Sequence, residues 1–252
     1  MSQLQKKIER IQRQEGPGIG FARITREKPR AMLLAAIAET AAEAQSALAD
    51  GADFVIVRAD DAASAAATVS DSMGEGACIG VLVESLDEAG AAALAKAGCD
   101  FAIAALESTA ATAVDTAVMG HVVDLPVATA DELTLRGLAP LGLDALYVGN
   151  VPGALTLAAR LDYVRAASMT GTPLIVGVTG SPAVADLRVL RDSGVAAVLV
   201  PAGTPLAAID EALRAVPAPA KARRSGRDLA LVPASGGHGH DEHDDEGDEA
   251  DE

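Results

Sequence analysis

A five-residue pattern that joins a helical stretch to an apolar run occurs four times along the chain, and this pattern decides the fold. The copies are Asp50-Gly51-Ala52-Asp53-Phe54, Ala97-Gly98-Cys99-Asp100-Phe101, Leu141-Gly142-Leu143-Asp144-Ala145 and Ser193-Gly194-Val195-Ala196-Ala197. The Gly in each copy suits the left-handed conformation that ends a helix. These glycines are 47, 44 and 52 residues apart, so the pattern marks a repeat of two βα units.

Working outward from these copies, short apolar runs alternate with Ala-rich stretches of helical length between residues 32 and 216. Such alternation is typical of βα units on a parallel sheet, whose strands are apolar on both faces. The predicted strands are Met32–Ile37, Phe54–Ala59, Ile79–Val83, Phe101–Leu106, His121–Leu125, Ala145–Gly149, Leu174–Val178 and Ala197–Val200. Met32–Ile37 could also belong to the helix after it, because periodicity does not assign a short apolar run.

The helix starts carry their own signals. Ser85 to Glu88 and Thr129 to Glu132 have the spacing of a capping box, and Ser181-Pro182 and Thr204-Pro205 would place Pro at the first helical position. Eight βα units in about 185 residues predict a compact (βα)8 barrel of the TIM type. An open doubly wound sheet is the alternative, which the short connections and the uniform composition disfavour.

The segment Glu39-Thr40-Ala41-Ala42-Glu43-Ala44, leading to Ala47-Leu48-Ala49-Asp50-Gly51-Ala52-Asp53-Phe54, resembles the first βα turn and second strand of aldolase-type and ribulose-phosphate-binding barrels. The resemblance extends over residues 32–216 and implies an active site at the carboxyl ends of the strands. It identifies the superfamily and no single family within it.

Charge divides the chain into three parts. Residues 1–30 carry a net charge of +5, and residues 3–14 place Leu4, Ile8 and Ile11 on one stripe of an amphipathic helix. We expect this helix to close the bottom of the barrel or to dock on a second subunit, which would make a homo-oligomer. Residues 31–216, the predicted barrel, carry −15, and residues 217–252 have the composition of a disordered acidic tail.

The formal net charge of −16 argues against nucleic acid as a general partner, because phosphate binding needs a basic face. The chain has no apolar stretch of the roughly 18 residues that a membrane span needs, and its polar start lacks the core of a secretory signal. We therefore expect a cytoplasmic protein with no membrane partner. Cys78 and Cys99 stand alone, as reduced core thiols do.

Carboxylates follow five successive predicted strands: Glu39, Asp60, Glu84, Glu107 and Asp124. Converging at one barrel mouth, they could bind Mg²⁺ or Mn²⁺ through two of Glu39, Asp60 and Glu84, with water and substrate oxygens as the other ligands. Glu84, Glu107 and Asp124 are also candidates for catalytic acids and bases. The structural alternative is that acids followed by Thr or Ser simply favour helix N-termini.

Arg58 is the single basic residue inside a predicted strand, and it could bind a substrate carboxylate or phosphate, or pair with Glu84. Asn150 follows the sixth strand and is a second substrate-binding candidate. The resemblance to phosphate-binding barrels adds the turns after strands 7 and 8, with the candidates Gly180, Ser181, Gly203 and Thr204; ordinary capped turns are the alternative.

No Lys lies at a predicted strand end, which excludes Schiff-base aldolase chemistry, and no dinucleotide fingerprint is present. The acidic mouth and Arg58 predict a lyase or isomerase that acts on a small phosphorylated or carboxylated metabolite. A barrel without catalysis, acting as a binding or assembly module through its N-terminal helix and charged tail, is the alternative.

Overall fold

The computed structural model describes residues 1–14, 29–74, 76–151 and 154–217. Its first half contains the elements α1 (Gln3–Gln14), β1 (Leu33–Ala38), α2 (Ala41–Ala49), β2 (Phe54–Arg58), α3 (Ala62–Ser72), β3 (Ile79–Leu82), α4 (Glu88–Lys96), β4 (Phe101–Ala105), η1 (Leu106–Ser108) and η2 (Ala111–Ala113). Its second half contains β5 (Gly120–Asp124), α5 (Glu132–Leu138), η3 (Ala139–Leu141), β6 (Ala145–Asn150), α6 (Leu157–Thr170), β7 (Leu174–Gly177), α7 (Val184–Asp192), β8 (Val195–Pro201) and α8 (Leu206–Ala215).

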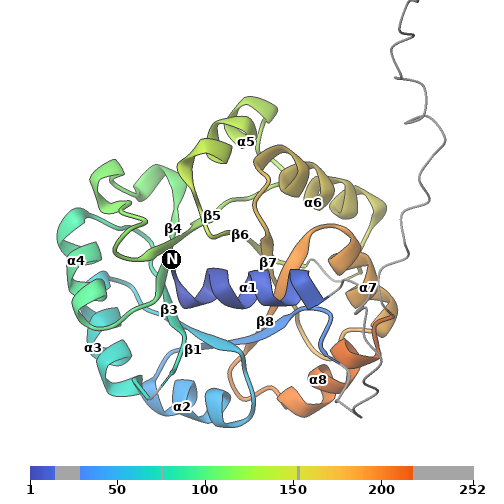
Figure 1. Cartoon of the computed structure of the whole chain (residues 1–252), viewed down its shortest axis with the longest axis horizontal. Coiled ribbons are helices and arrows are strands. Elements are labelled where there is room, and N and C mark those ends of the chain that lie inside the picture. Colours follow the sequence, from blue (N-terminus) through green and yellow to red (C-terminus); the bar gives the residue numbers. More distant parts are fainter. Residues whose placement is uncertain (15–28, 75, 152–153, 218–252) are drawn as a thin grey trace, which may run out of the picture. The chain divides into compact units, whose positions relative to one another are not determined.

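The eight strands form a closed parallel barrel in chain order, so the predicted (βα)8 fold is confirmed and the open sheet is wrong. β1 closes the ring by pairing with β8, with Leu33 opposite Ala197. Helices α2 to α8 surround the strands (Figure 1). The glycines that follow the helices adopt left-handed backbone, with φ of 96° at Gly51 and 93° at Gly194, as their place in the repeated pattern predicts.

The core has two layers, one between strands and helices and one inside the barrel. Inside, the ring of Phe101 meets the ring of Phe54 edge-on, with centroids 5.6 Å apart. The Phe101 ring also lies over Gly80, where an added Cβ would come within 2.2 Å of it. The two rings and small neighbours such as Ala35 and Ala197 fill the lower interior, which is therefore packed rather than open.

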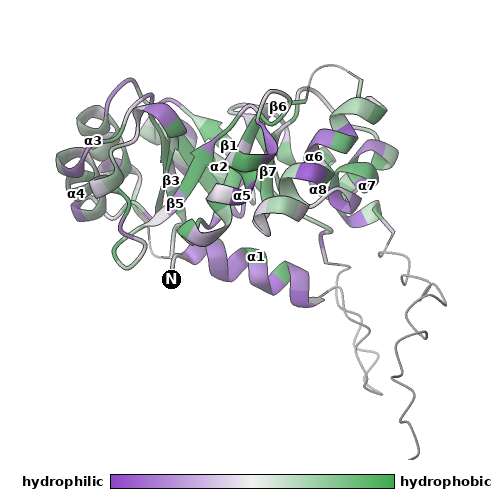
Figure 2. Ribbon diagram, turned by 90° about the horizontal axis from the view of Figure 1, so that it is seen from above, coloured by the Kyte–Doolittle hydropathy of each residue, from purple (hydrophilic) through white to green (hydrophobic). Residues whose placement is uncertain are grey.

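Helix α1 closes the end of the barrel where the strands begin (Figure 2). Leu4 and Ile8 are buried among the inward-facing residues of the barrel, at 0% and 3% exposure. The carboxylate of Asp100 accepts hydrogen bonds from the backbone N–H groups of Gln3 (2.7 Å) and Leu4 (2.8 Å), and so caps the first turn of α1 from a different element. Of the two placements expected for this helix, the structure shows closure of the barrel bottom.

Several expected helix starts are wrong by one or two residues. Helices α4 and α5 are capped by Asp87 and Asp131, not by Ser85 and Thr129. The chain cannot turn into α4 at Ser85, because Leu86 first forms a β-bridge with Thr109. Likewise α7 begins at Val184 and α8 at Leu206, after the prolines that the sequence suggested as their first residues.

Arg30 lies at the end of the barrel where the strands begin. It pairs with Asp53 (2.7 Å), just before β2 begins. Residues 15–28 of the basic N-terminal part and the predicted tail from residue 218 lie outside the described residues. Within the described ranges no helix is both long and apolar enough to span a bilayer.

Candidate active site at the barrel mouth

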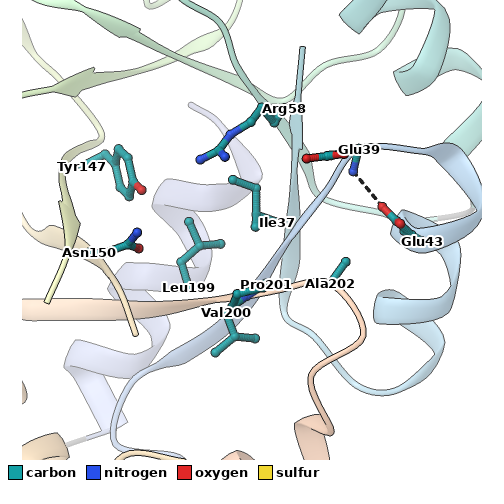
Figure 3. Close-up of a pocket in the computed structure, with 10 residues that line it drawn as sticks. All are labelled: Ile37, Glu39, Glu43, Arg58, Tyr147, Asn150, Leu199, Val200, Pro201 and Ala202. Carbon is teal, nitrogen blue, oxygen red and sulfur yellow. Dashed lines mark hydrogen bonds between the residues drawn. The ribbon is translucent and has the colours of Figure 1, made fainter. Parts of the chain in front are cut away.

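A cavity of about 330 Å³ opens where the strands end, which is room for a small metabolite. Strands β1, β2, β6 and β8 and the turn after β8 supply most of its wall (Figure 3). The cavity is lined by Ile37, Glu39, Glu43, Arg58, Tyr147, Asn150, Leu199, Val200, Pro201 and Ala202. The apolar residues form one side, and Glu39, Arg58, Tyr147 and Asn150 add polar groups of different chemistry.

Arg58, the last residue of β2, points its guanidinium toward Tyr147 across the cavity (Figure 3). It forms no salt bridge with a described carboxylate, so the expected structural alternative, a pair with Glu84, is not seen among these residues. An arginine that ends an otherwise apolar strand without a carboxylate partner is available for an anionic ligand.

Asp124 ends β5 directly opposite Tyr147 of β6 in the strand register. Paired residues of parallel strands point to the same side of the sheet, so the carboxyl and the phenol share the barrel interior. Burial raises the pKa of the Asp124 carboxyl, and the charge of Arg58 partly opposes this rise. Burial also raises the pKa of the Tyr147 phenol, with a further contribution from Asp124 and an opposing one from Arg58. Arg58, Asp124 and Tyr147 therefore interact electrostatically.

Two glycines, Gly149 and Gly177, allow the Asn150 side chain to lie at the mouth. Gly149 adopts a φ of 72°, and the register between β6 and β7 shifts between Tyr147 and Asn150, which is a bulge that redirects the end of the strand. The amide of Asn150 then lies over Gly177, where a Cβ would come within 1.9 Å of Asn150 Oδ1. The backbone is thus shaped to present this side chain to the cavity.

Glu43 has a structural role at the edge of the cavity. Its carboxylate accepts hydrogen bonds from the backbone N–H groups of Glu39 (2.8 Å) and Thr40 (3.3 Å), which completes a capping box with Thr40 at the start of α2. This box holds the turn after β1, so the Glu39 side chain stays at the mouth, on the side of Arg58 (Figure 3).

Of the five predicted carboxylates, Glu39 lines this cavity, and Asp60, Glu84, Glu107 and Asp124 are not among its lining residues. Asp60, Glu84 and Glu107 follow their strands as expected, but their side chains are exposed, whereas Asp124 is half-buried. The hydroxyl of Ser108 donates to the backbone oxygen of Glu84, which ties the two turns together. Across the described ranges no three His, Cys, Asp or Glu side chains gather as a metal site. Mg²⁺ or Mn²⁺ held by two carboxylates and water stays a prediction.

The predicted phosphate-binding residues Gly180, Ser181, Gly203 and Thr204 also lie outside the lining. Gly180 and Gly203 adopt left-handed backbone, with φ of 70° and 76°, and Ser181 and Thr204 are their neighbours. The β8 turn reaches the cavity through Pro201 and Ala202 instead. Phosphate binding by these turns stays a prediction.

Tyr147 is the functional candidate that the sequence reasoning missed. It lies within the run Ala-Leu-Tyr-Val-Gly, where an apolar strand explains an aromatic residue without further assumption. The available signal was its hydroxyl, because a phenol inside a strand that is otherwise aliphatic needs a polar environment.

Comparison with solved structures gives the same architecture. The chain resembles tryptophan synthase from M. tuberculosis with a TM-score of 0.60 and 14% identity, over 86% of this chain and 96% of the other. The tryptophan synthase alpha subunit of Legionella pneumophila str. Paris matches with a TM-score of 0.60 and 13% identity, over 86% and 97%. The chain has a (βα)8 barrel fold. No protein-family model and no curated protein matches it.

In this barrel the cavity with Arg58, Tyr147 and Asn150 occupies the end where barrel enzymes place their active sites. At such low identity the likeness concerns the fold alone, so the chemistry has to be argued from the side chains.

Proposed function

We propose that the protein is a lyase or isomerase that moves a proton on a small metabolite carrying a carboxylate or phosphate group. The observation that carries the proposal is the half-buried Asp124 carboxyl, which lies opposite Tyr147 in the strand register and within electrostatic reach of Arg58. A desolvated acid beside a cation in a cavity is a recurrent arrangement for proton transfer. The neighbouring barrel enzymes support an enzyme-like fold but give no substrate.

Arg58 is the binding group in this proposal. Its guanidinium would accept the anionic end of the substrate in a fork of two hydrogen bonds. Asn150 would donate to or accept from a hydroxyl or carbonyl on the same molecule, at the side of the cavity that the bulge creates. Leu199 and Ile37 would contact the carbon skeleton.

Asp124 is the proposed general base. In its ionised form it would remove a proton from a carbon next to a carbonyl, and the electron pair of that C–H bond would move into the carbonyl to give an enolate. Tyr147, whose raised pKa keeps the phenol protonated at neutral pH, would donate a hydrogen bond to the new oxyanion. Where the deprotonated carbon carries a hydroxyl group, transfer of the hydroxyl proton to the other oxygen and return of the first proton to the former carbonyl carbon complete an isomerisation. Where the substrate carries a leaving group at the β-carbon, its departure completes an elimination.

Exchange of substrate protons with solvent tests this step without knowledge of the product. The full chain would be incubated in D2O with a panel of small hydroxy acids, keto acids and sugar phosphates, and deuterium at the carbon next to the carbonyl would be followed by NMR. We expect exchange with at least one compound and a loss of about 100-fold or more in Asp124→Asn. Asp60→Asn is the matched control, because Asp60 follows β2 but its side chain is exposed, whereas Asp124 is half-buried inside the barrel opposite Tyr147.

Arg58 has its own test. Arg58→Gln should weaken binding of the exchanging compound about tenfold or more, whereas Arg136→Gln, which removes an exposed cation on α5, should leave it unchanged. Exchange that persists in Asp124→Asn would remove Asp124 from the mechanism. No exchange with any compound would favour the non-catalytic barrel instead.

A further inference from the structure

We propose that a second cavity, at the opposite end of the barrel from the mouth, binds the phosphate group of a small phosphorylated molecule. This basal cavity has a volume of about 370 Å³ and lies between α1, the starts of β1 and β2, and the end of α8. It is lined by Lys7, Arg10, Ile11, Pro29, Arg30, Leu33, Gly51, Asp53 and Arg214.

Four of the nine lining residues are cationic and one is acidic. This is unusual in a chain whose residues 31–216 carry eight basic and 23 acidic side chains. A concave site with one sign of charge concentrates the field and attracts ions of the opposite sign. The basal cavity is thus a place on an acidic barrel where an anion is favoured.

Two of the cations are already neutralised. Arg30 donates to Asp53 (2.7 Å), to Asp210 and to the backbone oxygen of Gly51 (2.9 Å), and Arg214 donates to Asp210 (2.9 Å). Burial would raise the pKa of Asp210, but the hydrogen bonds from Arg30 and Arg214 more than offset this and hold the pKa below its usual value. The Asp210 carboxylate therefore stays ionised and bound to these two arginines.

Lys7 and Arg10 provide the surplus charge. They are three residues apart on α1, which places them on neighbouring turns of one helix face. Within the described ranges neither forms a salt bridge, whereas Arg13 on the same helix pairs with Glu9 at 2.8 Å. Two unpaired cations at a cavity wall match the charge of a phosphate dianion.

The wall is also rigid and partly apolar. Helix α1 is held by Leu4 and Ile8, which are buried inside the barrel, so Lys7 and Arg10 project from a fixed support, and little entropy is lost when they bind. Ile11 and Leu33 line the same cavity and would contact a short carbon skeleton. These features favour a phosphorylated metabolite over a bare ion.

The test uses the full chain with Arg58→Gln as background, which removes the proposed anion group at the mouth. Isothermal titration with inorganic phosphate and with glycerol phosphate, at constant ionic strength, should show one site. Lys7→Gln with Arg10→Gln should weaken that site about tenfold or more. Lys6→Gln with Arg13→Gln is the matched control, because it removes the same charge from the same helix outside the cavity, and it should retain the affinity.

Three results would overturn the proposal. The first is no binding of either phosphate compound at millimolar concentration by a background chain whose circular dichroism shows native helix content. The second is an equal loss of affinity in both double variants, which would mean attraction to the basic helix in general. The third is citrate binding as tightly as glycerol phosphate, which would mean a polycarboxylate site. None of these results bears on proton exchange at the mouth, so this inference and the proposed function fail separately.

Discussion

Truncation of Leu4, the residue that α1 inserts into the bottom of the barrel, should destabilise the whole protein. Leu4 is fully buried and packs in the interior cluster of the barrel with Phe54 and Phe101. Leu4→Ala removes three carbons, each with about 0.8 kcal/mol of transfer free energy, so the transfer contribution alone is about 2.4 kcal/mol. The cavity that remains adds to this cost, and buried Leu→Ala changes lose about 2.7 to 5 kcal/mol in total. We expect a loss of about 3 kcal/mol.

Urea unfolding followed by circular dichroism measures this loss, and a thermal scan should show a fall in Tm of roughly 6 to 12 °C for a barrel of this size. Gln12→Ala on the exposed side of the same helix is the control and should change stability by less than about 0.5 kcal/mol. If Leu4→Ala behaved like Gln12→Ala, α1 would not be part of the folded core, and the preorganised wall of the basal cavity would be lost with it.

Three further changes test the interior and the mouth. Asp124→Asn should raise Tm at neutral pH, because the raised pKa of Asp124 means that ionisation of this carboxyl opposes folding. The gain in Tm should develop as the pH rises through and above the ordinary carboxyl pKa of 3.8 and should vanish below it. A gain in Tm that is constant with pH would contradict the assignment. Gly177→Ala should push Asn150 away from the cavity, since its Cβ would come within 1.9 Å of the amide, and weaken mouth ligands about tenfold in a titration; unchanged affinity would exclude Asn150 from binding. Gly80→Ala should cost about 1 to 3 kcal/mol in urea unfolding, because the Cβ would overlap the Phe101 ring at 2.2 Å, and a stable variant would show that the ring can move.

Local signals predicted the secondary structure well. All eight strands were placed to within two residues of their observed ends, because each is a short apolar run and four of them directly follow a helix-ending Gly. The helix starts were less predictable. Ser85 has a capping residue's chemistry, but Leu86 next to it bridges to Thr109, 23 positions along the chain, and this contact delays α4 until Asp87.

The candidate site was predicted in part. Arg58, Asp124, Asn150 and Glu39 stood out because polar residues after apolar strands gather at one end of a parallel barrel. Sequence could not separate the half-buried Asp124 from the equally placed but exposed Glu84, because local sequence does not show how far each side chain is buried.

The sequence by itself determined the eight βα units, the helix-ending glycines and an amphipathic helix ahead of the barrel, since these depend on neighbours within a few residues. The tertiary structure alone decided which polar groups meet. Asp124 faces Tyr147 through strand register, Asn150 reaches the mouth through a bulge over Gly177, and Arg30 meets Asp210 across 180 residues. Such pairs form because closure of the barrel and docking of α1 bring distant segments together, and no local preference encodes those distances.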